Sequence, residues 1–310
     1  MSISFIFPGQ GSQAVGMMSD LAEHHSLVKD LFVEASDVLS IDMWALSQEG
    51  PIEVLSQTEN TQPALLIAGV AAWRVWQSLG GRTPSIMAGH SLGEYTALVA
   101  AGALSFADGV ALVRDRGRYM QDAVPVGEGG MAAIIGLEDA QVKAVCAQVS
   151  AEHNMVLQAV NFNAPGQVVI AGSAAAITLA APAMKAAGAK RALPLPVSIP
   201  AHSSLMSPAS ARLAERLESV TVTSPSIPVL HNCNVQVASS VDDIKANLVS
   251  QLDSPVRWVE SVNKMHSGGA STFIESGPGR VLGGMVKRIV KGVNIGCIEK
   301  SESFKLLIDA

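Results

Sequence analysis

The sequence predicts an α/β fold, with a larger, α/β-hydrolase-like subdomain built on a parallel sheet and a smaller, ferredoxin-like subdomain inserted into it. Two observations carry this prediction. An apolar strand at residues 85–88 runs into a Gly-x-Ser-x-Gly turn and then a helix, which is the context of a nucleophile elbow. Residues 131–197 then follow the order β-α-β-β-α-β of the ferredoxin-like unit. We therefore expect residues 1–125 and 198–310 to form the larger subdomain, and residues 126–197 the smaller one.

Hydrophobic periodicity and turn residues define the individual elements. Strands are expected at residues 3–7, 85–88, 131–137, 155–162, 167–171, 191–197 and 272–275. Helices are expected at residues 27–39, 61–79, 92–101, 105–123, 138–149, 174–187 and 280–290. Pro63 falls near the first turn of the second of these helices, where proline is tolerated. Residues 127–130 and 194–200 are rich in glycine or proline and flank the inserted unit as hinges.

Composition favours a folded α/β protein and excludes several other classes. The chain has 310 residues, 48% of them hydrophobic and only 4% aromatic, so a sizeable core must be filled mainly by aliphatic side chains. The net charge of −6 provides no overall positive field, so we expect no nucleic-acid partner. The cysteines, Cys146, Cys233 and Cys297, match neither a disulfide framework nor zinc-ligand spacing and indicate reduced thiols.

Targeting and membrane signals are missing from the sequence. Residues 1–7 lack the basic start and the cleavage site of a signal peptide. The longest apolar stretch, residues 64–75, is too short to span a bilayer and is interrupted by Arg74. We therefore expect a cytoplasmic protein with no membrane partner.

Ser91, in Gly89-His90-Ser91-Leu92-Gly93, is the candidate nucleophile. A serine hydroxyl needs a nearby base to take its proton, and the elbow exposes that hydroxyl at the start of a helix whose free N–H groups can stabilise negative charge. An ordinary Gly/Ser turn is the alternative, but the flanking strand and helix favour the nucleophile. His90, next to it, is expected to point away from the nucleophile and to be structural.

Histidine is the expected base, because its side chain titrates nearest neutral pH. His202 lies in a loop at the junction after the inserted unit, where it can line a cleft, whereas His231 could be a packed strand histidine. Position alone favours His202 only modestly. No acid stands out as a third triad member, since Glu275 follows His202 in the chain and equally suits a helix cap or loop anchor. Gln251 is a candidate neutral partner for the histidine.

Arg116 is the candidate binding residue for a carboxylate. It shares the apolar face of its helix with Met120, whereas Arg114 and Arg118 are expected on the other side, near Asp122. A guanidinium on an apolar face is costly unless it is paired, and its fork matches a carboxylate. An internal ion pair and a carboxylate-bearing substrate both satisfy this requirement.

The loop at residues 9–14, Gly-Gln-Gly-Ser-Gln-Ala, formally fits a dinucleotide-binding fingerprint. That fingerprint also requires a second strand that ends in an acid about twenty residues later. Residues 27–39 instead have helical spacing, so we discount a nicotinamide cofactor. Backbone N–H groups of this loop could complete an oxyanion hole opposite Leu92.

Five motifs resemble those of the malonyl-CoA:acyl carrier protein transacylases of fatty-acid synthesis. They are Phe7-Pro8-Gly9-Gln10-Gly11-Ser12-Gln13, Gly89-His90-Ser91-Leu92-Gly93-Glu94-Tyr95, Arg116-Gly117-Arg118-Tyr119-Met120-Gln121, Asn161-Phe162-Asn163-Ala164-Pro165-Gly166-Gln167 and Pro200-Ala201-His202-Ser203-Ser204-Leu205-Met206. They occur in the family's order and cover nearly the whole chain. Together they are far more specific than the Gly-x-Ser-x-Gly turn alone.

The resemblance implies catalytic and binding roles for the candidates. Ser91 becomes the nucleophile, His202 its base and Arg116 the residue that binds the malonyl carboxylate. In this family a neutral oxygen orients the histidine, and Gln251 lies in the matching motif.

The same resemblance implies where the rest of the substrate is held. The backbone N–H groups of Gln10 and Leu92 would form the oxyanion hole. Coenzyme A is expected in the cleft between the subdomains, beside Asn161 and Asn163.

The implied reaction is a ping-pong transfer of the malonyl group from malonyl-CoA, through Ser91, to the phosphopantetheine thiol of acyl carrier protein. We expect a monomer that needs no metal and no cofactor. Acyl carrier proteins are acidic, so two basic clusters are candidate docking sites, although solvated surface charge is the favoured explanation for any single one of these residues. The clusters are Lys185, Lys190 and Arg191, and Lys287, Arg288 and Lys291. A thioesterase, a different acyltransferase and a non-enzymatic carrier-binding protein are the alternatives.

Overall fold

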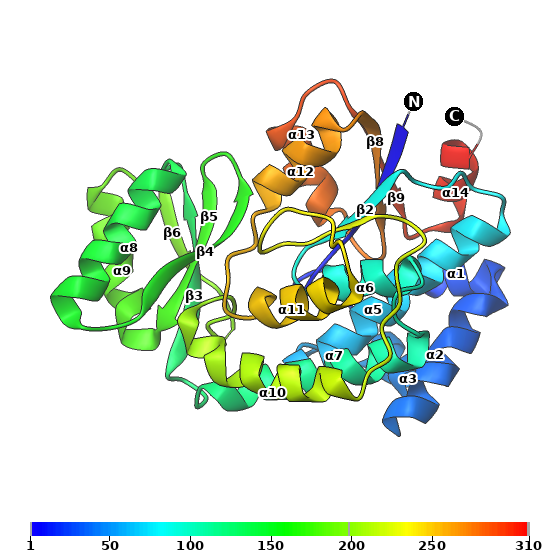
Figure 1. Cartoon of the computed structure of the whole chain (residues 1–310), viewed down its shortest axis with the longest axis horizontal. Helices are drawn as coiled ribbons and strands as arrows, with labels where there is room; N and C mark the ends of the chain where they lie inside the picture. The colour runs from blue at the N-terminus through cyan, green and yellow to red at the C-terminus, as the bar shows by residue number, and fades with distance from the viewer. Residues whose placement is uncertain (1, 198, 309–310) are drawn as a thin grey trace.

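The computed structural model describes residues 2–197 and 199–308 and divides into two sheets with their helices (Figure 1). The strands are β1 (Ser2–Phe7), β2 (Ile86–Gly89), β3 (Gly129–Ile135), β4 (Leu157–Ala164), β5 (Gln167–Ser173), β6 (Arg191–Pro194), β7 (Val229–Leu230), β8 (Ala270–Ser276) and β9 (Asn294–Ile298). The helices of the first half are α1 (Ser19–His24), α2 (Ser26–Leu39), α3 (Met43–Glu49), α4 (Ile52–Leu55), α5 (Thr58–Ser78), α6 (Leu92–Ala100) and α7 (Phe106–Ala123). Those of the second half are α8 (Asp139–His153), α9 (Ala174–Ala186), the 3-10 turn η1 (Ser204–Met206), α10 (Ser207–Glu218), α11 (Val241–Gln251), α12 (Trp258–Ser267), α13 (Val281–Ile289) and α14 (Ser301–Ile308).

The larger sheet is parallel, in the order β7-β2-β1-β8-β9, and is buried on both faces. Alternate side chains of its central strand β1 enter two different cores. Phe5 and Phe7 join a core that includes Trp73 of α5, whereas Ile6 joins Trp258 in a core with α12 and α13. Burial on both faces explains why the strand reads as a continuous apolar run in the sequence.

The smaller sheet is antiparallel, in the order β4-β5-β3-β6, and lies with α8 and α9 at one end of the molecule (Figure 1). This order and its β-α-β-β-α-β connections are those of the predicted ferredoxin-like unit. Val168 and Ile170 of β5 pack under the two helices, and Val169 between them points to the opposite face. The predicted fold class is therefore confirmed. The subdomain limits remain an expectation, and Ser198, where the second stretch of the larger subdomain was expected to begin, lies outside the described residues.

Two predicted elements differ in length from the observed ones. The strand expected at residues 191–197 ends at Pro194, because the prolines at 194 and 196 have no N–H with which to extend a ladder. The helix expected from residue 61 begins at Thr58, which places Pro63 inside α5. Proline cannot bond the carbonyl of Glu59, and the Arg114 guanidinium donates to that carbonyl instead, at 3.2 Å.

Within residues 2–197 and 199–308, every helix falls short of the length or apolar character that a membrane crossing would require.

Close contact between the start of α6 and the end of β1 depends on Gly93. A Cβ at Gly93 would lie 2.0 Å from the carbonyl oxygen of Phe7, so a side chain there would push the helix away from the sheet. Gly284, on α13, offers a matched control, since a Cβ there would meet no atom within 4 Å.

We predict that Gly93→Ala lowers the free energy of unfolding by about 3 kcal/mol or more, as expected for overpacking against rigid backbone. Gly284→Ala should raise it by about 0.5–1 kcal/mol, because alanine favours a helix interior over glycine. Urea unfolding followed by circular dichroism measures both. Equal stabilities of Gly93→Ala and the unmodified chain would show that α6 can move without cost.

Candidate active site

Ser91 stands on a sharp turn between β2 and α6. Its backbone angles are φ 52° and ψ −110°, a positive-φ conformation that a serine adopts only when its surroundings hold it there. The turn lifts the hydroxyl above the end of the parallel sheet, as expected for a nucleophile elbow. The preceding strand and following helix are those that the sequence predicted.

His202 lies beside the Ser91 hydroxyl and is oriented by a backbone carbonyl. Its Nε2 is 2.8 Å from Ser91 Oγ, and its Nδ1 is 2.7 Å from the carbonyl oxygen of Gln251. A carbonyl can only accept, so Nδ1 carries the proton and Nε2 is left free to accept the serine O–H. The arrangement suits a base that removes the serine proton.

The pKa of His202 is held well below that of an ordinary histidine. Burial, and next the positive charge of Arg116, lower it to about 3. The imidazole is therefore neutral at neutral pH and ready to accept a proton.

Arg116 reaches the same place from α7 and is 1% exposed. Its Nη2 lies 3.2 Å from Ser91 Oγ and 2.9 Å from Oε1 of Gln251, while its Nη1 donates to Oε1 of Gln62 at 2.8 Å. The guanidinium carbon is 5.1 Å from the centre of the Tyr95 ring. Burial lowers the pKa of Arg116, yet a guanidinium stays charged at neutral pH.

The charge of Arg116 has no carboxylate partner among the described residues. The internal ion pair that the sequence allowed is therefore not formed there, and Arg116 Nε also lacks a hydrogen-bond partner within that part of the chain. Arg114 and Arg118, expected on the other side of the helix near Asp122, form their ion pairs with a carboxylate of α5. Both pair with Glu59, at 3.0 and 2.9 Å, because the early start of α5 brings that carboxylate alongside α7.

Gln10 and Leu92, whose backbone N–H groups the sequence suggested for an oxyanion hole, both lie beside the elbow. Leu92 is the first residue of α6, so its N–H has no partner within the helix. Gln10 follows β1 in the loop beside the elbow, and both residues line the same cavity as Ser91.

That cavity, of about 480 Å³, lies between the two sheets. The larger subdomain contributes Ser91, His202 and Arg116. The smaller subdomain contributes Asn161 and Asn163, together with side chains on the face of its sheet opposite α8 and α9. Asn163 Oδ1 accepts a hydrogen bond from His90 Nε2 at 2.7 Å, so these residues join the elbow to β4.

Two residues that the sequence left as alternatives have other partners. Both oxygens of Glu275 accept backbone N–H groups at the start of α13, from Leu282 at 3.0 Å and Gly283 at 2.8 Å. His231 is bonded through Nδ1 to Oε1 of Glu94 at 2.7 Å. Neither one contacts the Ser91 hydroxyl.

Sequence reasoning missed Gln62 and Asn232. Gln62 lies close to the Pro63 that marked the helix start, but nothing in its local pattern indicated a contact with Arg116. Asn232 adjoins the His231 that was considered as a base, and its amide bonds the elbow backbone. Only the fold brings these segments together. Among the described residues, no three His, Cys, Asp or Glu side chains form a group that could hold a metal ion.

The chain matches known proteins along nearly its whole length. Residues 4–299 match the acyl transferase domain family. The chain is 50% identical over 306 residues to the malonyl CoA-acyl carrier protein transacylase of Escherichia coli strain K12, covering 99% of this chain and 98% of that protein.

Solved structures agree equally well. An acyl carrier protein S-malonyltransferase from Vibrio cholerae superposes with a TM-score of 0.96 at 51% identity, covering 99% of this chain and all of the other. A malonyl-transacylase solved in complex with a type II PKS acyl-carrier protein gives a TM-score of 0.98 at 48% identity, covering 100% and 99%. The chain therefore belongs to the malonyl-CoA:acyl carrier protein transacylase family of acyltransferases.

Proposed function

We propose that this enzyme transfers the malonyl group by a ping-pong mechanism through a malonyl ester of Ser91. The observation that carries the proposal is the unpaired, buried guanidinium of Arg116, 3.2 Å from Ser91 Oγ. A site that buries a positive charge beside its nucleophile favours an acyl group with its own negative charge. Malonyl-CoA has such a carboxylate, whereas acetyl-CoA would leave the guanidinium unpaired.

In the first half-reaction, His202 Nε2 takes the proton of Ser91 Oγ as this oxygen attacks the thioester carbon. The negative charge moves to the thioester oxygen, which the N–H groups of Gln10 and Leu92 stabilise. When the C–S bond breaks, His202 returns the proton to the sulfur and coenzyme A leaves. Asn161 and Asn163 line the cavity where part of the coenzyme A would lie.

In the second half-reaction, the phosphopantetheine thiol of acyl carrier protein gives its proton to His202 and attacks the ester carbon. The bond from that carbon to Ser91 Oγ then breaks, and His202 returns the proton to Oγ, which regenerates Ser91. The related malonyl-transacylase solved with its acyl-carrier protein supports this acceptor. Of the two basic clusters, the one at the C-terminal end of α13, with Lys291 just beyond the helix, is favoured, since the first turn of α13 lines the cavity. Its Arg288 also donates to the carbonyl of Pro165 at 2.9 Å. The steps invoke neither a cofactor nor a metal, and we expect a cytoplasmic monomer.

A thioesterase is the rival function, with water in place of the thiol. Such enzymes usually orient the histidine with an acid, whereas His202 is oriented by the Gln251 carbonyl. A neutral partner stabilises the imidazolium less than a carboxylate does, so attack by a thiol, which loses its proton more readily than water, is favoured.

The covalent intermediate can be seen directly by mass. We predict that mixing with malonyl-CoA adds one malonyl group to the intact chain, and that Ser91→Ala abolishes the adduct because the attacking oxygen is gone. Added acyl carrier protein should remove the malonyl group from the chain and gain the mass of that group. Buffer alone should remove the malonyl group slowly. Rapid release of free malonate would favour the thioesterase.

Acyl selectivity should depend on Arg116. Arg116→Ala should lower the preference for malonyl-CoA over acetyl-CoA by about 100- to 10,000-fold, as expected when a buried charged contact is lost. The ratio of kcat/KM values for the two donors measures it. Arg118→Ala is the control, because Arg118 is on the same helix but pairs with Glu59 at the surface. Full malonyl preference in Arg116→Ala would show that another group recognises the carboxylate.

The pH profile should report the low pKa of His202. Protonation of His202 below its pKa of about 3 removes the base, so kcat/KM should show no fall centred near the ordinary 6.5. Arg116→Ala removes a charge that lowers this pKa, so its acid limb should move to higher pH. Acylation rates of both proteins between pH 4.5 and pH 8, with folding checked at each pH, test this. An unmodified enzyme whose rate halves near pH 6.5 would contradict it.

A further inference from the structure

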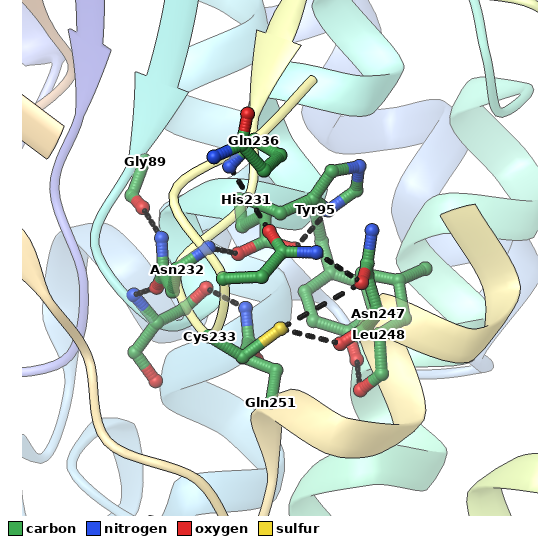
Figure 2. Close-up of polar contacts among 12 residues, drawn as sticks. Gly89, Tyr95, His231, Asn232, Cys233, Gln236, Asn247, Leu248 and Gln251 are labelled. Atoms are coloured by element: carbon green, nitrogen blue, oxygen red, sulfur yellow. Dashed lines mark hydrogen bonds and ion pairs between the residues drawn. The ribbon is translucent and has the colours of Figure 1, made fainter. Parts of the chain in front are cut away.

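Asn232, in the loop after β7, bonds the backbone of the elbow at Gly89 and at Ser91 itself. Its Oδ1 accepts the backbone N–H of Ser91 at 2.7 Å, and its Nδ2 donates to the carbonyl of Gly89 at 2.7 Å. Figure 2 shows the Asn232 amide beside Gly89, the last residue of β2. Asn232 is 1% exposed, so water cannot replace either bond at low cost.

The elbow needs these two hydrogen bonds because Ser91 has a positive φ. A non-glycine residue in this region costs about 1–3 kcal/mol and relaxes unless its neighbours prevent it. Relaxation would turn Oγ away from His202, and it would also turn the Leu92 N–H away from the place where negative charge develops.

Asn232 is itself fixed by the helix that Ser91 starts. Its backbone N–H donates to Oε2 of Glu94 at 2.8 Å, while Oε1 of Glu94 bonds His231 at 2.7 Å. Glu94 is fully buried, one turn along α6 from the nucleophile. The bonds therefore close a ring that runs from Ser91 along α6 to Glu94, across to Asn232 and back to the Ser91 N–H.

We infer that Asn232 is a positioning residue for the acylation of Ser91, held in place by Glu94 and His231. It fixes the strained backbone so that Oγ faces His202, and it occupies the Ser91 N–H so that the N–H of Leu92 remains the elbow's donor to the oxyanion. This inference rests on the proposed function, because its test measures the acylation of Ser91.

Replacement of Asn232 by aspartate gives a pH-dependent test that distinguishes the positioning of Ser91 from a purely structural role. A protonated aspartic acid can accept from Ser91 N–H and donate to Gly89 O as asparagine does, whereas an ionised one faces that carbonyl with a charge. Burial and the nearby Glu94 carboxylate both raise the pKa of such an aspartate. The other charged or titratable neighbours of position 232 are His231, Cys233, and Arg257, whose backbone N–H donates to Asn232 O at 3.3 Å.

The experiment measures single-turnover release of coenzyme A from malonyl-CoA between pH 6 and pH 8, with thermal unfolding of each variant. Asn232→Ala should acylate about 100-fold more slowly, as expected from a small displacement of reacting groups. Asn232→Asp should be slow at pH 8 and recover about tenfold or more by pH 6, while the unmodified enzyme does not. Asn234→Ala is the control, since Asn234 lies in the same loop but bonds Asn247 and Gln236 instead of the elbow.

Two results would overturn the inference: an Asn232→Ala rate within twofold of the unmodified enzyme, or an Asn232→Asp rate with no recovery at low pH. If Asn232→Ala fails to fold, the pH profile of the near-isosteric Asn232→Asp decides. If the unmodified enzyme releases no coenzyme A, the proposed function fails instead. The same variants are then compared by phosphonylation of Ser91 with a phosphonofluoridate, which forms the Oγ–P bond with loss of fluoride.

Discussion

The hydrogen bonds of Gln251 connect the three groups on which the chemistry depends. Its backbone carbonyl fixes the His202 tautomer, its side-chain oxygen accepts from Arg116, and its side-chain nitrogen donates to the carbonyl of Ser91 at 3.1 Å. Gln251 is the last residue of α11 and is fully buried. One rigid helix end therefore sets the positions of the base, the nucleophile and the cation relative to one another.

The acceptors around Arg116 are neutral, and this has electrostatic consequences. A buried charge normally requires a counter-charge, because desolvation is costly. Here Gln62 and Gln251 satisfy guanidinium hydrogen bonds without neutralising it. The field that remains helps to lower the pKa of His202. An acid in either position would stabilise the empty enzyme but would also raise the pKa of the base and compete with a carboxylate-bearing substrate.

The sequence allowed the elbow, the inserted sheet and the unusual character of Arg116 to be predicted, because each is a local pattern of turn residues or periodicity. Pro63 misplaced the start of α5, since a side chain from another helix satisfies the carbonyl that proline leaves free. Local patterns favoured His202 over His231 only modestly. The roles of Glu94 and Asn232 could not be predicted for the same reason, since hydrogen bonds between residues 138 positions apart exist only in the folded chain.

The Arg116 guanidinium beside Ser91 has a further consequence, for ligands other than malonyl-CoA. Without substrate the site is half of an ion pair, and the acyl group supplies the other half. Selectivity and inhibition then have the same cause. The charge that makes the cavity prefer a malonyl group also makes it bind small free carboxylates of similar length. The strength of that competition is set by the same desolvated charge, and it should weaken in step with selectivity whenever that charge is neutralised.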